Sequence, residues 1–171
     1  FSLGSLEDAV IQIAGIKGTS DFELRKRGLI IMCADNGVVE EGVTQTGQEV
    51  TAIVAENFLK YDTSVGVMCK QNHAEIFPVD MGMVTDTKVR TDHKIAYGTQ
   101  NMTKGPAMTR EQAVKGLEAG IDMVRELNDK GYRILATGEM GIGNTTTSSA
   151  VASVLLKQPV EEMTGRGAGL T

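Results

Sequence analysis

The sequence contains no tryptophan, and aromatic residues of all kinds make up only 4% of its 171 residues. Proteins that hold nucleic-acid bases by stacking need aromatic side chains, and proteins that follow a phosphate backbone need an excess of positive charge. The formal net charge at pH 7 is instead −5. We therefore expect no nucleic-acid partner.

Cysteine and histidine are also scarce, with two residues of each. Cys33 and Cys69 do not form a disulfide framework, and we interpret them as small buried hydrophobic residues in a reducing cytoplasm. His73 and His93 have no cysteine or histidine partner at the spacing of metal ligands. The sequence therefore predicts a cytoplasmic protein with neither a metal site nor a cofactor.

Long hydrophobic runs are missing as well. No apolar run approaches the roughly 20 residues that a membrane-spanning helix needs, and the first residues lack the charged and then apolar order of a signal peptide. We expect no membrane association. The sequence ends in a glycine-rich segment, where a domain rarely stops. We therefore predict one α/β domain over residues 1–171 that is a fragment of a longer protein.

Hydrophobic patterning predicts helices that alternate with strands. The continuous apolar run at residues 29–34 is typical of a strand covered on both faces. Thr109 and Gln112 form a capping box at the start of the clearest helix, whereas Pro78 argues against a central position for its strand. Residues 84–108 show no clear pattern. The predicted helices cover residues 5–16, 49–60, 63–70, 109–131 and 144–157, and the predicted strands cover residues 29–34, 74–79 and 132–136.

This alternation predicts an α/β fold with a Rossmann-like, mostly parallel sheet flanked by helices. Such sheets bind ligands at the carboxyl ends of their strands. Three predicted strand ends carry an acid, namely Asp35, Asp80 and Glu139, and neighbouring parallel strands would bring these carboxylates to one edge. An alternative interpretation of Asp35 and Asp80 is that they accept hydrogen bonds from loop amides or cap helices.

The main functional signal is the segment that follows the third predicted strand. A glycine-spaced turn there leads into a helix with Asn144 or Thr145 as its N-cap, and the unpaired N–H groups of a helix start bind anions. The spacing matches neither a dinucleotide fingerprint nor a P-loop. Glu139 places a carboxylate within this turn, so we expect a substrate with a phosphate at one end and a reacting centre at the other. The glycines are Gly138, Gly141 and Gly143.

A second glycine-rich segment lies close to the end of the sequence. Its backbone amides and one guanidinium are suited to phosphate, although the same composition is also typical of a flexible tail. The residues are Gly165, Arg166, Gly167, Ala168 and Gly169.

Four segments occur in an order that strongly resembles the nicotinate-nucleotide–dimethylbenzimidazole phosphoribosyltransferases of the cobalamin lower-ligand pathway. They are residues 34–43, 48–51, 138–146 and 165–170. The resemblance implies transfer of the phosphoribosyl group of nicotinate mononucleotide to 5,6-dimethylbenzimidazole or a related base. The products are α-ribazole 5′-phosphate and nicotinate. It also implies a homodimer.

The resemblance further implies roles for particular residues. Glu139 corresponds to the active-site glutamate of the family, and Gln48 to a residue beside the acceptor base. Residues 167–169 correspond to the phosphate-binding loop. Asn36 stands where family members usually carry histidine, and we include it with Asp35 and Asn144 among the expected substrate-binding residues. The glutamate that serves as general base in the family lies in its C-terminal part, so we expect little turnover from this chain alone. Alternatives are a non-catalytic nucleotide- or base-binding module and a partner subunit derived from the family.

Overall fold

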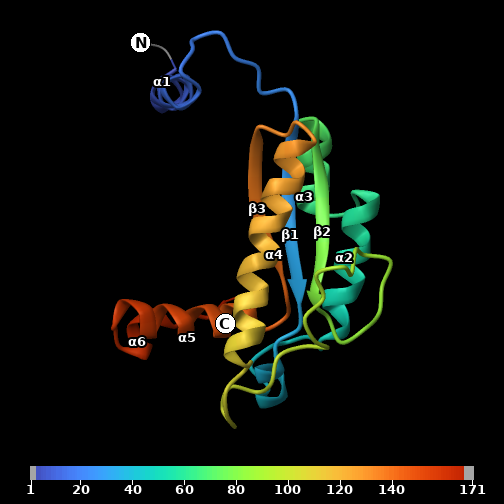
Figure 1. Cartoon of the computed structure of the whole chain (residues 1–171). Helices are drawn as coiled ribbons and strands as arrows, with labels where there is room; N and C mark the ends of the chain where they lie inside the picture. The colour runs from blue at the N-terminus through green and yellow to red at the C-terminus, as the bar shows by residue number, and fades with distance from the viewer. Residues whose placement is uncertain (1–2, 168–171) are drawn as a thin grey trace.

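The computed structural model describes residues 3–167, which form a parallel sheet with helices on both faces (Figure 1). The strands are β1 (Arg27–Ala34), β2 (Ala74–Gly82) and β3 (Ile134–Met140). The helices are α1 (Ser5–Lys17), the 3₁₀ helix η1 (Gly37–Glu41), α2 (Glu49–Lys60), α3 (Ser64–Gln71), α4 (Arg110–Asp129), α5 (Asn144–Leu156) and α6 (Val160–Met163).

The strand order is β2-β1-β3, and both strand pairs are parallel. The predicted α/β class and parallel sheet are therefore confirmed. β1 is central, and Ile31 pairs with Pro78 on one side and with Gly138 on the other. Within residues 3–167, β2 pairs with no named strand except β1. Pro78 thus lies in a strand at the edge of the described sheet. Because proline has no N–H group to donate, it disrupts fewer inter-strand hydrogen bonds there than in a central strand.

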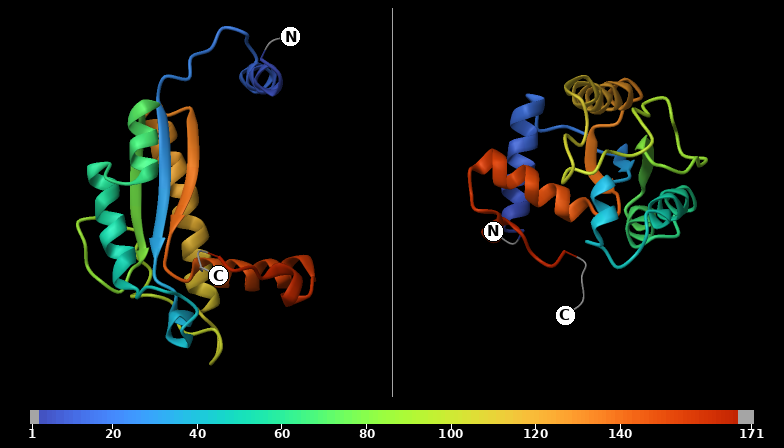
Figure 2. Two further views of the ribbon diagram at one scale, coloured as in Figure 1. Left: turned by 180° about the vertical axis from the view of Figure 1, so that it is seen from behind. Right: turned by 90° about the horizontal axis from the view of Figure 1, so that it is seen from below.

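Helices cover the sheet from both sides, as Figures 1 and 2 show: α4 lies on one face, and α2 and α3 lie on the other. Leu29, Ile31 and Cys33 of β1 pack with α2 and α3, whereas Ile30 packs with Met123 of α4. Successive side chains of a strand point to opposite faces. An uninterrupted apolar run is therefore what a strand between two helical layers requires, as the sequence indicated.

The start of α4 follows the local sequence signal, whereas the extent of the third strand does not. Thr109 and Gln112 form both hydrogen bonds of the capping box at α4. The third strand, predicted at residues 132–136, instead spans Ile134–Met140, so Gly138 lies within the strand and not in a turn. The reason is the pairing with β1, which continues to Cys33 and Met140 and outweighs the local preference of glycine for turns.

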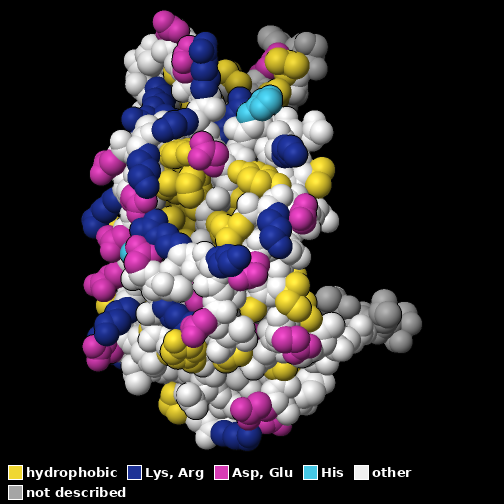
Figure 3. Space-filling model, turned by 90° about the vertical axis from the view of Figure 1, so that its right-hand side faces the viewer, with side chains coloured by type: hydrophobic (Ala, Val, Ile, Leu, Met, Phe, Trp, Pro, Cys, Tyr) yellow, Lys and Arg dark blue, Asp and Glu magenta, His cyan; other side chains and the backbone are white. Residues whose placement is uncertain are grey.

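Some helices lie away from the sheet. All residues of α1 are at least partly exposed, and α5 and α6 extend from the carboxyl end of the sheet (Figure 1). Apolar side chains are exposed on α1 and α5, with Ile16 at 84% and Leu155 at 75%. Figure 3 views the molecule from the edge of the sheet at which β2 lies, where hydrophobic side chains lie among charged ones. Among the described residues, no helix combines the length and apolar character needed to cross a membrane.

Asp80 anchors the segment after β2 to the sheet. It is fully buried, and its Oδ1 accepts a hydrogen bond of 2.8 Å from the N–H of Met83. The Nζ of Lys94 lies 3.1 Å from Asp80 Oδ2 and 3.8 Å from the centre of the Tyr97 ring. Burial lowers the pKa of Lys94, but the hydrogen bonds and charges of Asp80 and Asp86 together raise it above its usual value. These contacts tie Met83, Lys94 and Tyr97 to the end of β2, at the start of the segment 84–108 that shows no clear sequence pattern.

We expect Lys94→Met to lower the free energy of unfolding by about 3 to 5 kcal/mol, because it leaves a buried carboxylate without its counter-charge. Urea unfolding followed by circular dichroism measures the change. Lys88→Met is the matched control, since Lys88 is exposed and makes no ion pair within residues 3–167. Its effect should stay within about 0.5 kcal/mol. Equal losses in the two variants would contradict a structural role for the Asp80–Lys94 pair.

Candidate active site

The carboxyl ends of the three strands meet at one end of the sheet. Cys33 of β1 pairs with Asp80 of β2 and with Met140 of β3, and Glu139 pairs with Met32. The segments that follow β1 and β3 therefore begin side by side. The sequence predicted this meeting of strand ends, and it brings Glu139 and Asn36 into one region.

The segment between β3 and α5 is a tight turn that depends on two glycines. A Cβ atom on Gly141 would lie 2.3 Å from the carbonyl oxygen of Ala34, so only glycine allows this close approach. Gly143 has φ 85° and ψ 1°, the values of the third residue of a type II turn, and Asn144 N–H donates to Gly141 C=O at 3.1 Å. We call residues 141–144 the glycine turn.

The N-cap of α5 is Gly143, not Asn144 or Thr145 as the sequence indicated. The turn needs a left-handed residue directly before the helix, and that requirement displaces the usual side-chain cap. Asn144 is consequently the first helical residue. Its side chain is free to donate a hydrogen bond from Nδ2 to the carboxylate of Glu139.

A pocket of about 290 Å³ opens beside the glycine turn. It is lined by residues 43–46, residues 141–145 and Arg166. The backbone N–H groups of Gly143 and Thr145 have no acceptor within the described part of the chain. The pocket therefore combines unpaired amides at a helix start with a guanidinium, which is an arrangement suited to an anion.

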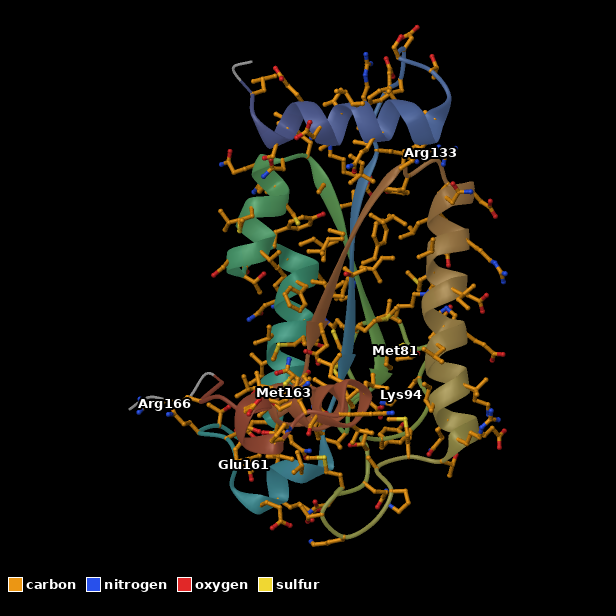
Figure 4. The ribbon with its side chains drawn as sticks, turned by 90° about the vertical axis from the view of Figure 1, so that its left-hand side faces the viewer. Met81, Lys94, Arg133, Glu161, Met163 and Arg166 are labelled. Atoms are coloured by element: carbon orange, nitrogen blue, oxygen red, sulfur yellow. The ribbon has the colours of Figure 1, made fainter. Side chains whose placement is uncertain are left out.

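The second glycine segment approaches the first, and Arg166 lies at the same end of the molecule as the carboxyl ends of the strands (Figure 4). A Cβ atom on Gly167 would lie 2.6 Å from Thr145 Oγ1, so the backbone of Gly167 passes directly against α5. Gly165 precedes this contact and has open space around its Cα. Ala168 and Gly169 lie outside the described residues.

Glu139 lies on β3 at the margin of this pocket. A Cβ atom on Gly141 would be 2.7 Å from Glu139 Oε1, so the carboxylate rests against the glycine turn. Glu139 is exposed at the surface of β3, but desolvation of its carboxyl by neighbouring atoms raises the pKa, and the hydrogen bond from Asn144 opposes this shift. A partly desolvated carboxylate interacts more strongly with a nearby positive charge than one fully in water.

Asn36 and Gln48 hold backbone segments around the site. Asn36 Nδ2 donates to the C=O of Ile142 at 3.0 Å, and its Oδ1 accepts a hydrogen bond of 3.3 Å from Thr147 Oγ1. Gln48 Nε2 donates to the C=O of Asn36 at 2.9 Å. Sequence reasoning missed Thr51, which is fully buried and accepts a hydrogen bond of 3.1 Å from Ile142 N–H. The sequence feature that could have indicated this contact is a polar residue on the buried face of α2, which needs a hydrogen-bond partner.

Asp35 and Gly138 lie near the site without lining the pocket beside the glycine turn. Asp35 is fully buried, and its Oδ2 accepts a hydrogen bond of 2.8 Å from Val84 N–H. Gly138 packs against Ile31, to which its Cβ would approach within 3.3 Å. For both Asp35 and Asp80, the observed contacts are those of the loop-amide alternative. Within residues 3–167, no three His, Cys, Asp or Glu side chains come together as a metal site.

The parallel α/β sheet and the anion-suited pocket define the class of protein as an α/β protein with a candidate phosphate site at its strand ends. Comparison with known proteins identifies the family. A family model described as Phosphoribosyltransferase matches residues 1–171. This chain belongs to that phosphoribosyltransferase family.

Individual relatives bear similar names. The chain is 52% identical to nicotinate-nucleotide–dimethylbenzimidazole phosphoribosyltransferase of Clostridium acetobutylicum, with 99% of this chain and 49% of the relative covered. It is 51% identical to the protein of that name from Ruminiclostridium cellulolyticum, over the same shares. The crystal structure of CobT from Thermus thermophilus is similar with a TM-score of 0.91 and 36% identity, over 99% of this chain and 52% of that one. The chain spans about half the length of these relatives.

We expect Asn144→Ala to raise the pKa of Glu139 further, because it removes the hydrogen bond that lowers this pKa. A larger fraction of the carboxyl would then be protonated at a given pH. Carbon-13 NMR titration of the Glu139 carboxyl measures the change. The control is Asn128→Ala, at the C-terminal end of α4, which should leave the titration of Glu139 unchanged. A pKa unchanged or lowered in Asn144→Ala would show that the hydrogen bond does not stabilise the charged carboxylate.

Proposed function

We propose that this chain is the phosphate-binding half of an enzyme that transfers the phosphoribosyl group of nicotinate mononucleotide to 5,6-dimethylbenzimidazole or a related base. The products are α-ribazole 5′-phosphate and nicotinate, within cobalamin biosynthesis. The observation that carries the proposal is the pocket beside the glycine turn, which is lined by Gly143, Thr145 and Arg166 and by Asn144, the residue that donates a hydrogen bond to Glu139. The names of the relatives support this choice of substrates. We further propose a cytoplasmic homodimer.

The phosphate of the nucleotide binds in this proposal to the N–H groups of Gly143 and Thr145 and to the guanidinium of Arg166. This places the ribosyl group on the side of Glu139. Positive charge develops on the ribosyl anomeric carbon as the bond to nicotinate breaks, and a fixed carboxylate nearby stabilises that charge. The partial desolvation of Glu139 strengthens this interaction.

The incoming base must also lose a proton from its attacking nitrogen, which requires a second group that accepts it. Within the described residues, the side chains that line the pocket beside the glycine turn include no carboxylate and no histidine. We therefore assign this proton transfer to a residue outside residues 3–167. Binding of the nucleotide and turnover are then separable properties, and this chain retains the first without the second.

Arg166→Met tests the phosphate contact. We expect this chain to bind nicotinate mononucleotide in a calorimetric titration, and the variant to bind it about 10- to 100-fold more weakly, because a hydrogen bond to a charged group contributes about 1.5 to 3 kcal/mol. Inorganic phosphate should compete with the nucleotide, and nicotinate should not. The control is Arg125→Met on α4, an exposed arginine outside the pocket. Binding of nicotinate with no effect of phosphate would overturn the proposal, and equal affinities would exclude Arg166 from the contact.

Glu139→Gln tests the role of the carboxylate in a protein extended to the length of its relatives. We expect kcat to fall by about 100-fold or more, because charge stabilisation in the transition state is lost, with little change in the affinity for inorganic phosphate. Glu161→Gln on α6 (Figure 4) is the control and should leave kcat unchanged. A loss of phosphate affinity with normal kcat would show that Glu139 binds substrate and does not assist the reaction. No turnover by the extended parent protein would favour the non-catalytic binding module.

A further inference from the structure

Ile142, in the middle of the glycine turn, is held at both of its backbone polar groups by side chains from other elements. Its N–H donates to Thr51 Oγ1 of α2 at 3.1 Å, and its C=O accepts from Asn36 Nδ2, after β1, at 3.0 Å. We call these two hydrogen bonds the Ile142 clamp. It joins the turn to α2 and to the segment after β1.

The burial of Thr51 fits this contact. Thr51 is fully buried on α2, whose other buried residues are Ala52, Ala55 and Phe58. A hydroxyl without a partner is costly in such surroundings, and an apolar side chain of the same size would pack there without that cost. The hydrogen bond from Ile142 N–H is what the hydroxyl contributes at this position.

Asn36 extends the clamp to neighbouring segments. Its Oδ1 accepts from Thr147 Oγ1 in the first turn of α5, and its C=O accepts from Gln48 Nε2 at the N-cap of α2. The glycine turn, the start of α5 and the start of α2 are thus tied to one residue. Thr51 supplies the clamp bond that comes from the buried face of α2, and its side chain does not line the pocket beside the glycine turn.

An anion site built from backbone amides requires that those amides point in fixed directions before the ligand arrives. Glycine has the largest backbone freedom of any residue, and ordering one residue costs about 1 to 2 kcal/mol. A turn with glycines at positions 141 and 143 would lose this freedom on binding unless the fold had already removed it. Prior ordering of the turn therefore increases affinity without any added contact to the ligand.

We propose that Thr51 is a positioning residue: through the backbone of Ile142, it orders the glycine turn so that the N–H groups of Gly143 and Thr145 face the bound phosphate. The inference rests on the proposed function and deepens it. Thr51 touches no substrate in this assignment. Its contribution appears in the affinity for the phosphate end of the substrate and not in the recognition of the acceptor base.

Thr51→Val and Thr51→Ser form the test pair, because valine keeps the size of threonine and serine keeps the hydroxyl. In this chain, we expect Thr51→Val to weaken binding of nicotinate mononucleotide about 3- to 10-fold, as the loss of one neutral hydrogen bond implies. Thr51→Ser should bind within about twofold of the parent. Amide hydrogen exchange should become faster at Ile142 in Thr51→Val and stay slow in Thr51→Ser.

Ser153→Ala is the matched control, since Ser153 is also buried and its Oγ donates a hydrogen bond of 2.6 Å to the C=O of Gln158, away from the glycine turn. It should lower stability without weakening nucleotide binding. In the extended protein, Thr51→Val should raise the KM for the nucleotide and leave the KM for the base unchanged. Nucleotide binding by the parent with equal binding by Thr51→Val would overturn this inference alone. Failure of the parent to bind nucleotide or phosphate would overturn the proposed function and this assignment with it.

Discussion

The burial of β1 on both faces and along both edges is the constraint on which the rest of the structure depends. Leu29, Ile30 and Ile31 are each at most 6% exposed, because α2 and α3 cover one face and α4 covers the other. A strand in this position has its register set by hydrogen bonds to two neighbours at once. β1 pairs with both neighbours as far as Cys33, its register with β2 shifts between Cys33 and Ala34, and the segments that form the candidate site start there.

Contacts with the carboxyl end of β1 determine the position of the glycine turn. The carbonyl of Ala34 excludes a Cβ atom at position 141, and Asn36 binds the backbone of Ile142. Both contacts come from residues at or directly after the end of β1. The glycines of the turn thus serve close approach to a neighbouring strand as well as the left-handed geometry at Gly143. The geometry of the glycine turn therefore depends on two adjacent strand ends and not on one loop.

The sequence predicted features that depend on residues close together in the chain. It missed features that depend on contacts with other elements of the fold. The apolar run of β1 and the capping box at Thr109 carry their own signals, and both were confirmed. The extent of β3 was predicted too short, because pairing with β1 carries the strand through Gly138. The contact between Thr51 and Ile142 joins residues 91 positions apart. No local pattern encodes such a contact, although a threonine on the inner face of α2 is a polar residue in need of a partner.

The candidate site lies beside parts of the described structure that are exposed. β3 carries Glu139, yet within the described residues it pairs on one side only, and Ile134 and Ala136 on it are exposed. Apolar side chains on α1 and α5 are exposed as well, and monomeric proteins rarely leave extended apolar surfaces uncovered. The glycine turn is tied by hydrogen bonds to Asn36 after β1 and to Thr51 of α2, whereas Glu139 lies on β3, the strand that pairs on one side only within the described residues. In the proposed function, Glu139 stabilises the developing positive charge and a group outside residues 3–167 accepts the proton, so the two tasks of the displacement fall to separate residues.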